Sequence, residues 1–235
     1  MAIRFYNRIL LKLSGEALSG DLTHGICKET LSMICNGIKK AADTGAQIGI
    51  VVGGGNIWRG RDAEGMNRTR ADHIGMLATI MNALSLADAL EKTGAVVRVQ
   101  SAIPIIQFAE PYIRQKALSH MGRGRIVVFG GGTGNPYFST DSAAALRAAE
   151  LGADALFKAT MVDGVYDKDP NKDITAVKYD ELSHKDILVN DLKVLDGAAV
   201  SICRESNIPC LVFDIRDPDN IYRAVCGDKI GTLVT

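Results

Sequence analysis

Residues 130–141 combine, within one short stretch, the residue types that could hold a phosphate group. The glycine-rich run 130–134 follows the apolar residues Ile126–Phe129, and the stretch closes with Ser139-Thr140-Asp141 before an alanine-rich segment. Glycines let backbone N–H groups come close to an anion, and the N-terminus of a helix adds partial positive charge. We therefore expect a phosphate to bind here, while Ser139 or Thr140 also fits the N-cap of the following helix.

A second glycine run has the same design. Gly53-Gly54-Gly55 follows the apolar stretch Ile48–Val52, and Arg59 comes shortly after it. A guanidinium group can grip two phosphate oxygens at once. A flexible linker would also be rich in glycine, but a linker is not expected inside a compact α/β unit. The run is therefore predicted to bind an anion.

The first apolar stretch of the chain ends in a lysine and a short turn. Lys12 is followed by Ser14-Gly15 and then by a helical pattern. A lysine at the end of a strand is either a solvated charge or a ligand for an anion. The glycine turn directly after it favours the second interpretation, since it leaves backbone N–H groups accessible.

A fourth segment, residues 158–170, begins where another apolar run ends. Its Asp163-Gly164 pair is typical of a tight hairpin turn. On its own the segment would be only a surface hairpin. Beside the glycine runs, Tyr166 could pack against a base, and Asp169 could accept hydrogen bonds from a sugar or a base.

The remaining pattern indicates the elements that position these segments. Short apolar runs alternate with helical stretches, which predicts a mostly parallel sheet covered by helices on both faces. Ligands of such sheets bind beyond the carboxyl ends of the strands. No linker or repeat interrupts the pattern, so residues 1–235 are predicted to form a single α/β domain. The predicted strands are Ile9–Leu13, Ile48–Val52, Val96–Val99, Ile126–Phe129, Ala155–Lys158, Cys210–Phe213 and Thr232–Val234, and the clearest helices are Glu29–Asp43, Thr69–Lys92 and Ser142–Leu151.

The composition argues against several classes of protein. The 27 basic and 27 acidic residues give zero net charge, which disfavours an extended nucleic-acid surface. The five cysteines are odd in number and include no C-x-x-C pair, so neither disulfides nor a metal site is expected. No uninterrupted apolar run of membrane-spanning length is visible, and a cytoplasmic protein without a membrane partner is expected. The Walker A motif, the dinucleotide fingerprint G-x-G-x-x-G and the serine elbow G-x-S-x-G are missing.

Taken in order, the motifs resemble those of the amino-acid-kinase family and, in detail, its branch of bacterial uridylate (UMP) kinases. The resemblance covers nearly the whole chain, and the ordered set is far more specific than any one motif. The matching motifs are Leu11–Leu18, Gly53–Asn56 with Arg59-Gly60, Gly65–Arg68, Ala71–Thr79 with Asn82, Ser101–Pro104, Thr133–Asp141, Lys158–Pro170 and Gly231–Leu233.

The resemblance implies a three-layer α/β/α sandwich, the amino-acid-kinase fold, and transfer of the ATP γ-phosphoryl group to UMP. It also implies a homohexamer and a requirement for Mg²⁺ with ATP, although no metal ligand is assigned to the protein. Asp141 would orient Lys12 or the metal rather than act as a base. The residues implied in catalysis are Lys12, Arg59, Asp141 and, more weakly matched, Asp196.

The same resemblance divides the remaining site residues between two nucleotides. Those implied to face ATP are Lys12, Ser14, Gly15, Gly55, Arg59, Thr160, Tyr166 and Asp169. Those implied to build the UMP site are Gly54, Asp72, Thr133, Gly134, Asn135, Pro136, Tyr137, Phe138, Ser139 and Thr140.

Departures from the family pattern bear on regulation. Ala87 and Glu91 stand where GTP-activated relatives carry basic residues, and the turn 20–25 also differs, which argues against activation by GTP. Inhibition by UTP is expected, because UTP can occupy the acceptor pocket. The apolar helix Thr69–Lys92 is the expected subunit contact. Two alternatives stay open: a family member that acts on a carboxylate, carbamate or phosphonate, and a non-catalytic nucleotide-binding module.

Overall fold

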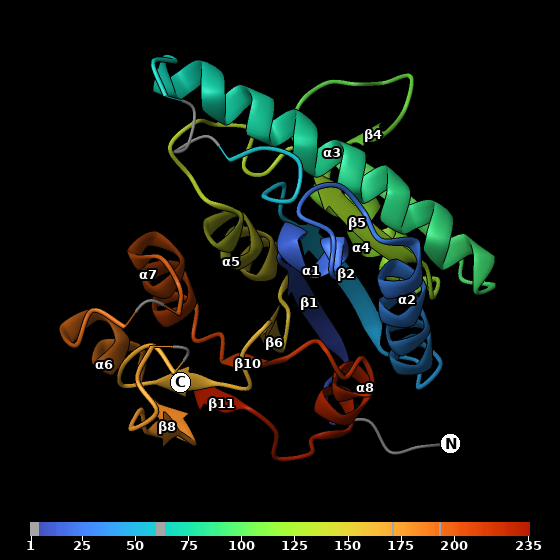
Figure 1. The fold of residues 1–235 in the computed structure, drawn as a ribbon. Coiled ribbons are helices and arrows are strands. Elements are labelled where there is room, and N and C mark those ends of the chain that lie inside the picture. The colour runs from blue at the N-terminus through green and yellow to red at the C-terminus, as the bar shows by residue number, and fades with distance from the viewer. Residues whose placement is uncertain (1–4, 60–63, 171, 193) are drawn as a thin grey trace.

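The apolar runs form one nine-stranded sheet in the computed structural model, which describes residues 5–59, 64–170, 172–192 and 194–235 (Figure 1). The strand order is β4-β3-β5-β2-β1-β6-β10-β11-β9, and every neighbouring pair is parallel except β10 and β11. All seven predicted strands are present, with small shifts at their ends. The bounds are β1 Arg8–Leu13, β2 Gln47–Val52, β3 Val97–Ser101, β4 Glu110–Pro111, β5 Ile126–Gly130, β6 Ala155–Thr160, β9 Glu181–Leu182, β10 Cys210–Asp214 and β11 Thr232–Val234.

Helices cover both faces of the sheet, which confirms the predicted three-layer α/β/α sandwich. Helices α2, α3 and α8 pack on one face, and α4, α5, α6 and α7 pack on the other (Figure 1). The three clearest predicted helices correspond to α2, α3 and α5. The bounds are α1 Gly15–Ser19, α2 Lys28–Ala42, α3 Arg68–Lys92, α4 Arg114–Gly122, α5 Thr140–Leu151, α6 His184–Val189, α7 Gly197–Glu205 and α8 Asp219–Cys226.

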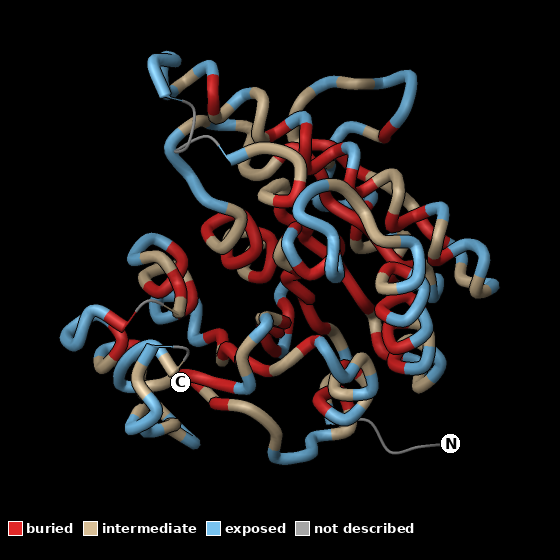
Figure 2. Tube along the Cα trace, in the orientation of Figure 1, coloured by how far each residue is buried: buried red, intermediate tan, exposed pale blue. Residues whose placement is uncertain are grey.

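Each face of the sheet has its own hydrophobic core. Successive side chains of a strand point to opposite faces, so Ile9, Leu11 and Leu13 enter one core while Leu10 enters the other. Buried residues follow the strands and the inner sides of the helices in Figure 2. Burying apolar surface contributes roughly 25 cal/mol per Å², so these two cores are the main source of stability for the sheet that carries the site.

Helix α5 begins directly beside the expected phosphate site because of its capping residues. Ser139 is the N-cap and accepts hydrogen bonds from the backbone N–H groups of Asp141 and Ser142. Gly152 ends the helix in a left-handed conformation, with φ 60°, that glycine adopts without strain. Four of the five alanines of this helix are buried, and their small side chains let its axis lie close to the sheet.

One expectation from the sequence needs correction. Asp163-Gly164 does not form the turn of a hairpin: it lies before strand β7 (Val165–Tyr166), which pairs with β8 (Lys178–Tyr179) across a longer connection. Helix α3 is long and apolar enough, by length and composition alone, to cross a membrane, but Asp72, Asn82 and Asp88 interrupt its apolar residues. Half of its most apolar stretch is buried inside the fold, as expected for a core helix of this sandwich.

Candidate active site

The four segments predicted to contact a nucleotide follow four strands that are neighbours in the sheet. These strands lie in the order β5-β2-β1-β6 and run parallel to one another. Parallel strands place their carboxyl ends at one edge of a sheet, where ligands of such folds bind. Segments that are far apart in the sequence therefore meet at a single edge.

Three charged side chains form the centre of this edge. The register of β1 and β6 places Lys12 directly opposite Lys158. Asp141, in the first turn of α5, faces both: its Oδ1 lies 2.8 Å from Lys12 Nζ, and its Oδ2 lies 2.5 Å from Lys158 Nζ. The carboxylate therefore fixes the positions of two ammonium groups, and the cluster keeps one net positive charge.

Burial sets the protonation behaviour of this cluster. Desolvation would raise the pKa of Asp141, but the charges and hydrogen bonds of Lys12 and Lys158 outweigh it and hold the pKa below its ordinary value. Desolvation lowers the pKa of Lys12; Asp141 opposes this change, whereas the neighbouring Lys158 adds to it. An incoming anion would relieve the repulsion between the two lysines, so the cluster favours a phosphate.

The loops after β1 and β2 are packed against each other too closely for side chains. A Cβ atom at Gly15 would lie 2.5 Å from Asn56 Oδ1 and 2.7 Å from the backbone N of Gly55. A Cβ atom at Gly54 would lie 2.9 Å from the carbonyl oxygen of Gly75 in helix α3. Only glycine fits at these two positions, because a side chain there would clash with the neighbouring loop or with helix α3. The absence of side chains also leaves the backbone of both loops accessible to a ligand.

Two buried asparagines hold the second glycine loop. Asn82, on α3, donates to the carbonyl oxygen of Gly53 at 2.6 Å and to Asn56 Oδ1 at 2.7 Å. Asn56 in turn donates to Asn82 Oδ1 and to the carbonyl oxygen of Gly25. Because both asparagine side chains are buried, the amide pair fixes the loop to the helix.

Helix α3 also positions the loop after β5. The backbone N–H of Gly131 donates to Thr79 Oγ1 at 2.8 Å, and that of Tyr137 donates to Asp72 Oδ2 at 2.9 Å. Tyr137 has φ 72°, which is uncommon for a residue with a side chain. Arg68 bonds Asp72 from the other side and lies over the Tyr137 ring. The carboxylate of Asp72 thus supports the loop from helix α3.

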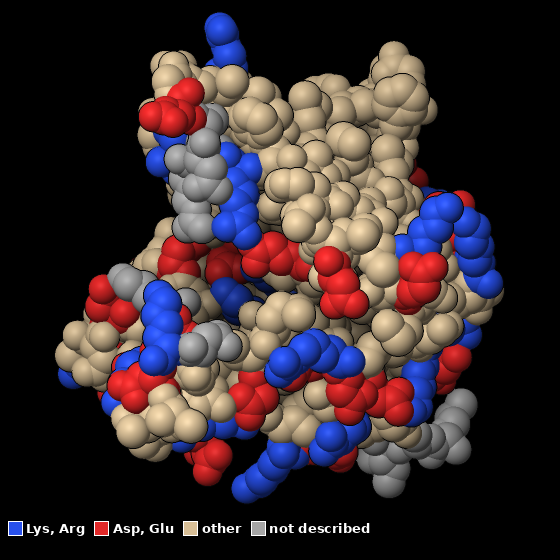
Figure 3. Space-filling view, in the orientation of Figure 1, with Lys and Arg blue, Asp and Glu red and all other residues tan. Residues whose placement is uncertain are grey.

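A cavity of about 510 Å³, the central cavity, lies between α3 and the loops after β1, β2 and β5. Arg59 is ion-paired with Glu16 at this cavity. Figure 3 shows a hollow on this side of the molecule, with basic side chains inside it and acidic side chains at its rim. Its lining includes the predicted site residues Lys12, Ser14, Gly15, Gly54, Gly55, Arg59, Asp72, Tyr137, Phe138, Ser139 and Thr140.

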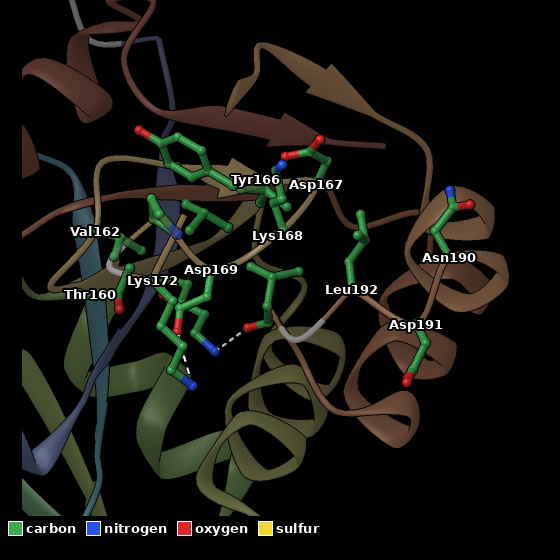
Figure 4. Close-up of a pocket in the computed structure, with 16 residues that line it drawn as sticks. Thr160, Val162, Tyr166, Asp167, Lys168, Asp169, Lys172, Asn190, Asp191 and Leu192 are labelled. Atoms are coloured by element: carbon green, nitrogen blue, oxygen red, sulfur yellow. Dashed lines mark hydrogen bonds and ion pairs between the residues drawn. The ribbon is translucent and has the colours of Figure 1, made fainter. Parts of the chain in front are cut away.

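A second cavity of about 520 Å³, the lateral cavity, lies next to the end of β6. Its lining includes the predicted residues Thr160, Tyr166 and Asp169, together with Lys158. Figure 4 shows the Tyr166 ring at one end of the cavity and Asn190 and Asp191 across from it. The Tyr166 hydroxyl donates to Asp163 Oδ1 at 2.7 Å. The two cavities therefore meet the same lysine–aspartate cluster from different sides.

Besides Asp141, five predicted site residues lie outside both linings. Thr133, Gly134, Asn135 and Pro136 form a turn in the loop after β5, where Thr133 Oγ1 accepts from the backbone N–H of Asn135. Asp196 is the N-cap of α7 and bonds to the start of α5. The binding and catalytic roles of these residues stay predictions.

A comparison with a family model shows to which protein family the chain belongs. A model of the amino acid kinase family matches residues 7–214. The chain belongs to the amino-acid-kinase family. Within this family, the chain is similar to a solved UMP kinase from Bacillus anthracis, with 41% identity and a TM-score of 0.94 over 98% of this chain and 96% of that one.

Two further solved members of the family have the same arrangement over nearly their whole length. A UMP kinase from Ureaplasma parvum is 35% identical, with a TM-score of 0.91, and the match covers 97% of this chain and 98% of that one. A uridylate kinase from Archaeoglobus fulgidus is 32% identical, with a TM-score of 0.75 over 97% of this chain and 99% of that one.

Several residues of the amino-acid-kinase site were not assigned from the sequence. Lys158 was considered as the end of a strand and the start of the motif Lys158–Pro170 but was given no role in the site, although a lysine in an otherwise apolar run is a usable signal. Asn82 and Thr79 are polar residues within the apolar pattern of α3, and Arg68 begins that helix. Their contacts depend on which strands and helices become neighbours, and a single sequence does not show this.

Proposed function

We propose that this member of the amino-acid-kinase family is a UMP kinase, which transfers the γ-phosphoryl group of ATP to UMP and forms ADP and UDP. The product would supply pyrimidine nucleotide biosynthesis. The similarity to three solved UMP or uridylate kinases, at 32% identity or more and over nearly the whole chain, supports this activity.

The observation that carries the proposal is the position of Asp141 between the two cavities. It pairs with Lys12, which lines the central cavity, and with Lys158, which lines the lateral cavity. A donor nucleoside in the lateral cavity and an acceptor in the central cavity would bring their phosphates together at this cluster. Asp141 would keep the two ammonium groups apart and correctly aimed.

To catalyse this reaction, the protein must align the two nucleotides and neutralise the charge of their phosphate groups. A phosphate oxygen of UMP attacks the γ-phosphorus, the bond to the β–γ bridging oxygen breaks, and ADP leaves. The attacking oxygen is already anionic at neutral pH, so no general base is needed. A cation–anion contact at about 4 Å contributes roughly 4 kcal/mol at an effective dielectric constant near 20, before desolvation costs. Lys12, Lys158 and Arg59 would supply such contacts.

The residues of the site fit a magnesium ion that arrives with ATP. The described residues include no group of three or more His, Cys, Asp or Glu side chains that could hold a metal. Mg²⁺ is commonly held by substrate phosphates, water and one or two carboxylates. Asp141 is the carboxylate of the cluster, but its oxygens face two lysines, so the nucleotide phosphates would provide most ligands. Bound Mg²⁺ would neutralise part of the phosphate charge.

The finer properties of the enzyme are part of the same proposal. UTP would inhibit by occupying the central cavity in place of UMP. The enzyme would work in the cytoplasm as a homohexamer and would not require GTP.

A steady-state screen of acceptors tests the proposed activity. With ATP and Mg²⁺ fixed, turnover is measured with UMP, CMP, glutamate, aspartate and carbamate. We expect UMP to be preferred by about 100-fold or more in kcat/KM, because a polar site rejects substrates that leave its groups unpaired. Preference for a carboxylate or carbamate acceptor would assign another reaction of the family. Nucleotide binding without turnover of any acceptor would assign a binding module.

A further inference from the structure

Asp196 is engaged inside the protein and contributes to neither cavity lining among the described residues. Its carboxylate accepts hydrogen bonds from three donors: the hydroxyl of Ser139, the hydroxyl of Ser142 at 2.8 Å, and the backbone N–H of Ala199 at 2.8 Å. The last bond caps helix α7. The other two tie the start of α7 to the start of α5, on which Asp141 lies.

The chain just before Asp196 forms a wall of the lateral cavity. Asn190, Asp191, Leu192 and Val194 all contribute to its lining. The carbonyl oxygen of Val194 accepts a hydrogen bond from Lys158 Nζ, the same ammonium group that pairs with Asp141. A nucleotide that contacts this wall would therefore act on the segment that ends at Asp196.

One of the two serines, Ser139, lies at the central cavity. Ser139 lines that cavity and, as the N-cap of α5, accepts from the backbone N–H groups of Asp141 at 3.0 Å and Ser142 at 3.1 Å. Ser142 is buried and has no capping function of its own. The carboxylate of Asp196 thus bonds Ser139, which both lines the central cavity and bonds the backbone N–H of Asp141.

We propose that Asp196 is a positioning residue that couples the two cavities. A nucleotide seated against residues 190–192 and 194 fixes Asp196, and Asp196 fixes Ser139 and the acceptor side of the central cavity. Thermodynamic linkage makes this coupling reciprocal, so UMP strengthens ATP binding by the same factor by which ATP strengthens UMP binding. This inference rests on the proposed UMP kinase activity.

The substitution Asp196→Ser separates coupling from helix capping. Serine is also a favourable N-cap, so it can keep the bond to the N-terminus of α7. It is shorter and uncharged, and it would lose the charge-assisted bonds to the serines of α5. Ser142→Ala removes one of those bonds without affecting either helix cap. Ser201→Ala, an exposed change on α7, is the matched control.

Isothermal titration calorimetry on the full chain measures the coupling directly. The Kd of UMP is determined with and without a saturating, non-hydrolysable β,γ-imido analogue of ATP and Mg²⁺. We expect the analogue to tighten UMP binding by about fivefold or more in the wild type and in Ser201→Ala. In Asp196→Ser the two values should become nearly equal, and Ser142→Ala should lose part of the effect.

The inference is overturned if the wild type shows no coupling, or if Asp196→Ser keeps the full wild-type ratio. Should Asp196→Ser fail to fold, an unchanged ratio in Ser142→Ala overturns it instead. A wild type that phosphorylates UMP but shows no coupling rejects this inference alone. A wild type without UMP turnover in the acceptor screen rejects the proposed function, and the inference falls with it.

Kinetics distinguish positioning from direct participation of Asp196. A positioning role predicts that Asp196→Ser raises the KM of UMP at saturating ATP, with the shape of the pH profile of kcat/KM unchanged. Loss of a limb of that profile would identify Asp196 as a proton donor or acceptor and contradict the inference.

Discussion

At the scale of single residues, the site depends on one carboxylate that serves two cations. Lys12 and Lys158 come from neighbouring strands, and their like charges would repel each other without Asp141 between them. A partly buried ion cluster of this kind is stable only when each charge has a partner. Phosphate groups of the substrates would add the partners that the net positive cluster lacks.

Removal of the Lys12 ammonium group should lower the rate of the reaction more than the affinity for UMP. We expect Lys12→Ala to lower kcat by about 10²–10³-fold, because the lost charge acts mainly on the transition state, while the Kd of UMP changes little. Steady-state kinetics and calorimetry measure the two quantities. Lys39→Ala, which removes an exposed ion pair on α2, is the control. Equal losses in kcat and UMP affinity would instead indicate a binding role for Lys12.

The lowered pKa of Lys12 predicts a pH dependence. In the free enzyme the ammonium group should lose its proton below the usual lysine range, so kcat/KM should fall as the pH rises through that pKa. At pH values between the lowered pKa of the folded state and the ordinary lysine pKa, Lys12 binds more protons in the unfolded chain than in the folded one. The contribution of Lys12 to the free energy of unfolding therefore rises with pH in this range. Lys12→Arg should shift the alkaline limb to higher pH. A limb that stays in place would assign it to another group.

At the scale of elements, helix α3 supports the loops that line the central cavity. It contributes Thr79 and Asp72 to the loop after β5, and Asn82 to the loop after β2. These contacts explain why polar residues occur on an otherwise apolar helix. The glycine loops can remain free of side chains because a neighbouring helix holds them.

Asn82→Leu tests this support. The substitution keeps a similar shape but leaves the carbonyl oxygen of Gly53 and the amide of Asn56 without their buried partner. We expect the free energy of unfolding to fall by about 1–3 kcal/mol, measured by urea denaturation, and the KM values of both nucleotides to rise. Ser85→Ala on the same helix removes only an exposed hydroxyl and should change neither quantity. A variant as stable as the wild type would show that the amide pair is not needed.

At the scale of the whole molecule, one face carries few charged side chains. In Figure 3 this face lies over helix α3 and the neighbouring connection to β4. Leu77 and Met81 of α3 are 49% and 56% exposed. Exposed apolar patches of this kind often mark protein–protein contacts. The expected homohexamer would use this helix as a subunit contact.

Charged substitutions on α3 test that contact. We expect the double substitution Leu77→Glu with Met81→Glu to convert the oligomer into smaller species, because burying a carboxylate at an interface is costly. Size-exclusion chromatography with light scattering measures the mass. Met33→Glu, at a comparably exposed methionine of α2, is the control and should leave the mass unchanged. An unaltered mass for the α3 variant would place the contact elsewhere.

Local features of the chain were determined by its sequence alone. The apolar runs specified the strands, the alternation with helices specified a parallel sheet, and Ser139 was one of two residues expected to cap α5. These signals are local because strand formation and helix capping depend on residue types that are neighbours in the sequence. The hairpin at Asp163-Gly164 was wrong for the same reason: its dipeptide fits a tight turn, but the partner strand begins much later in the chain.

The order and register of the strands were decided only by the tertiary structure. They bring four separate loops to one edge, set Lys158 opposite Lys12, and place Asp141 between them. The segment before Asp196 likewise meets Lys158 and α5 only in the folded chain. Strand order follows from the packing of both helical layers on the sheet, a long-range balance of buried apolar surface that no short motif contains.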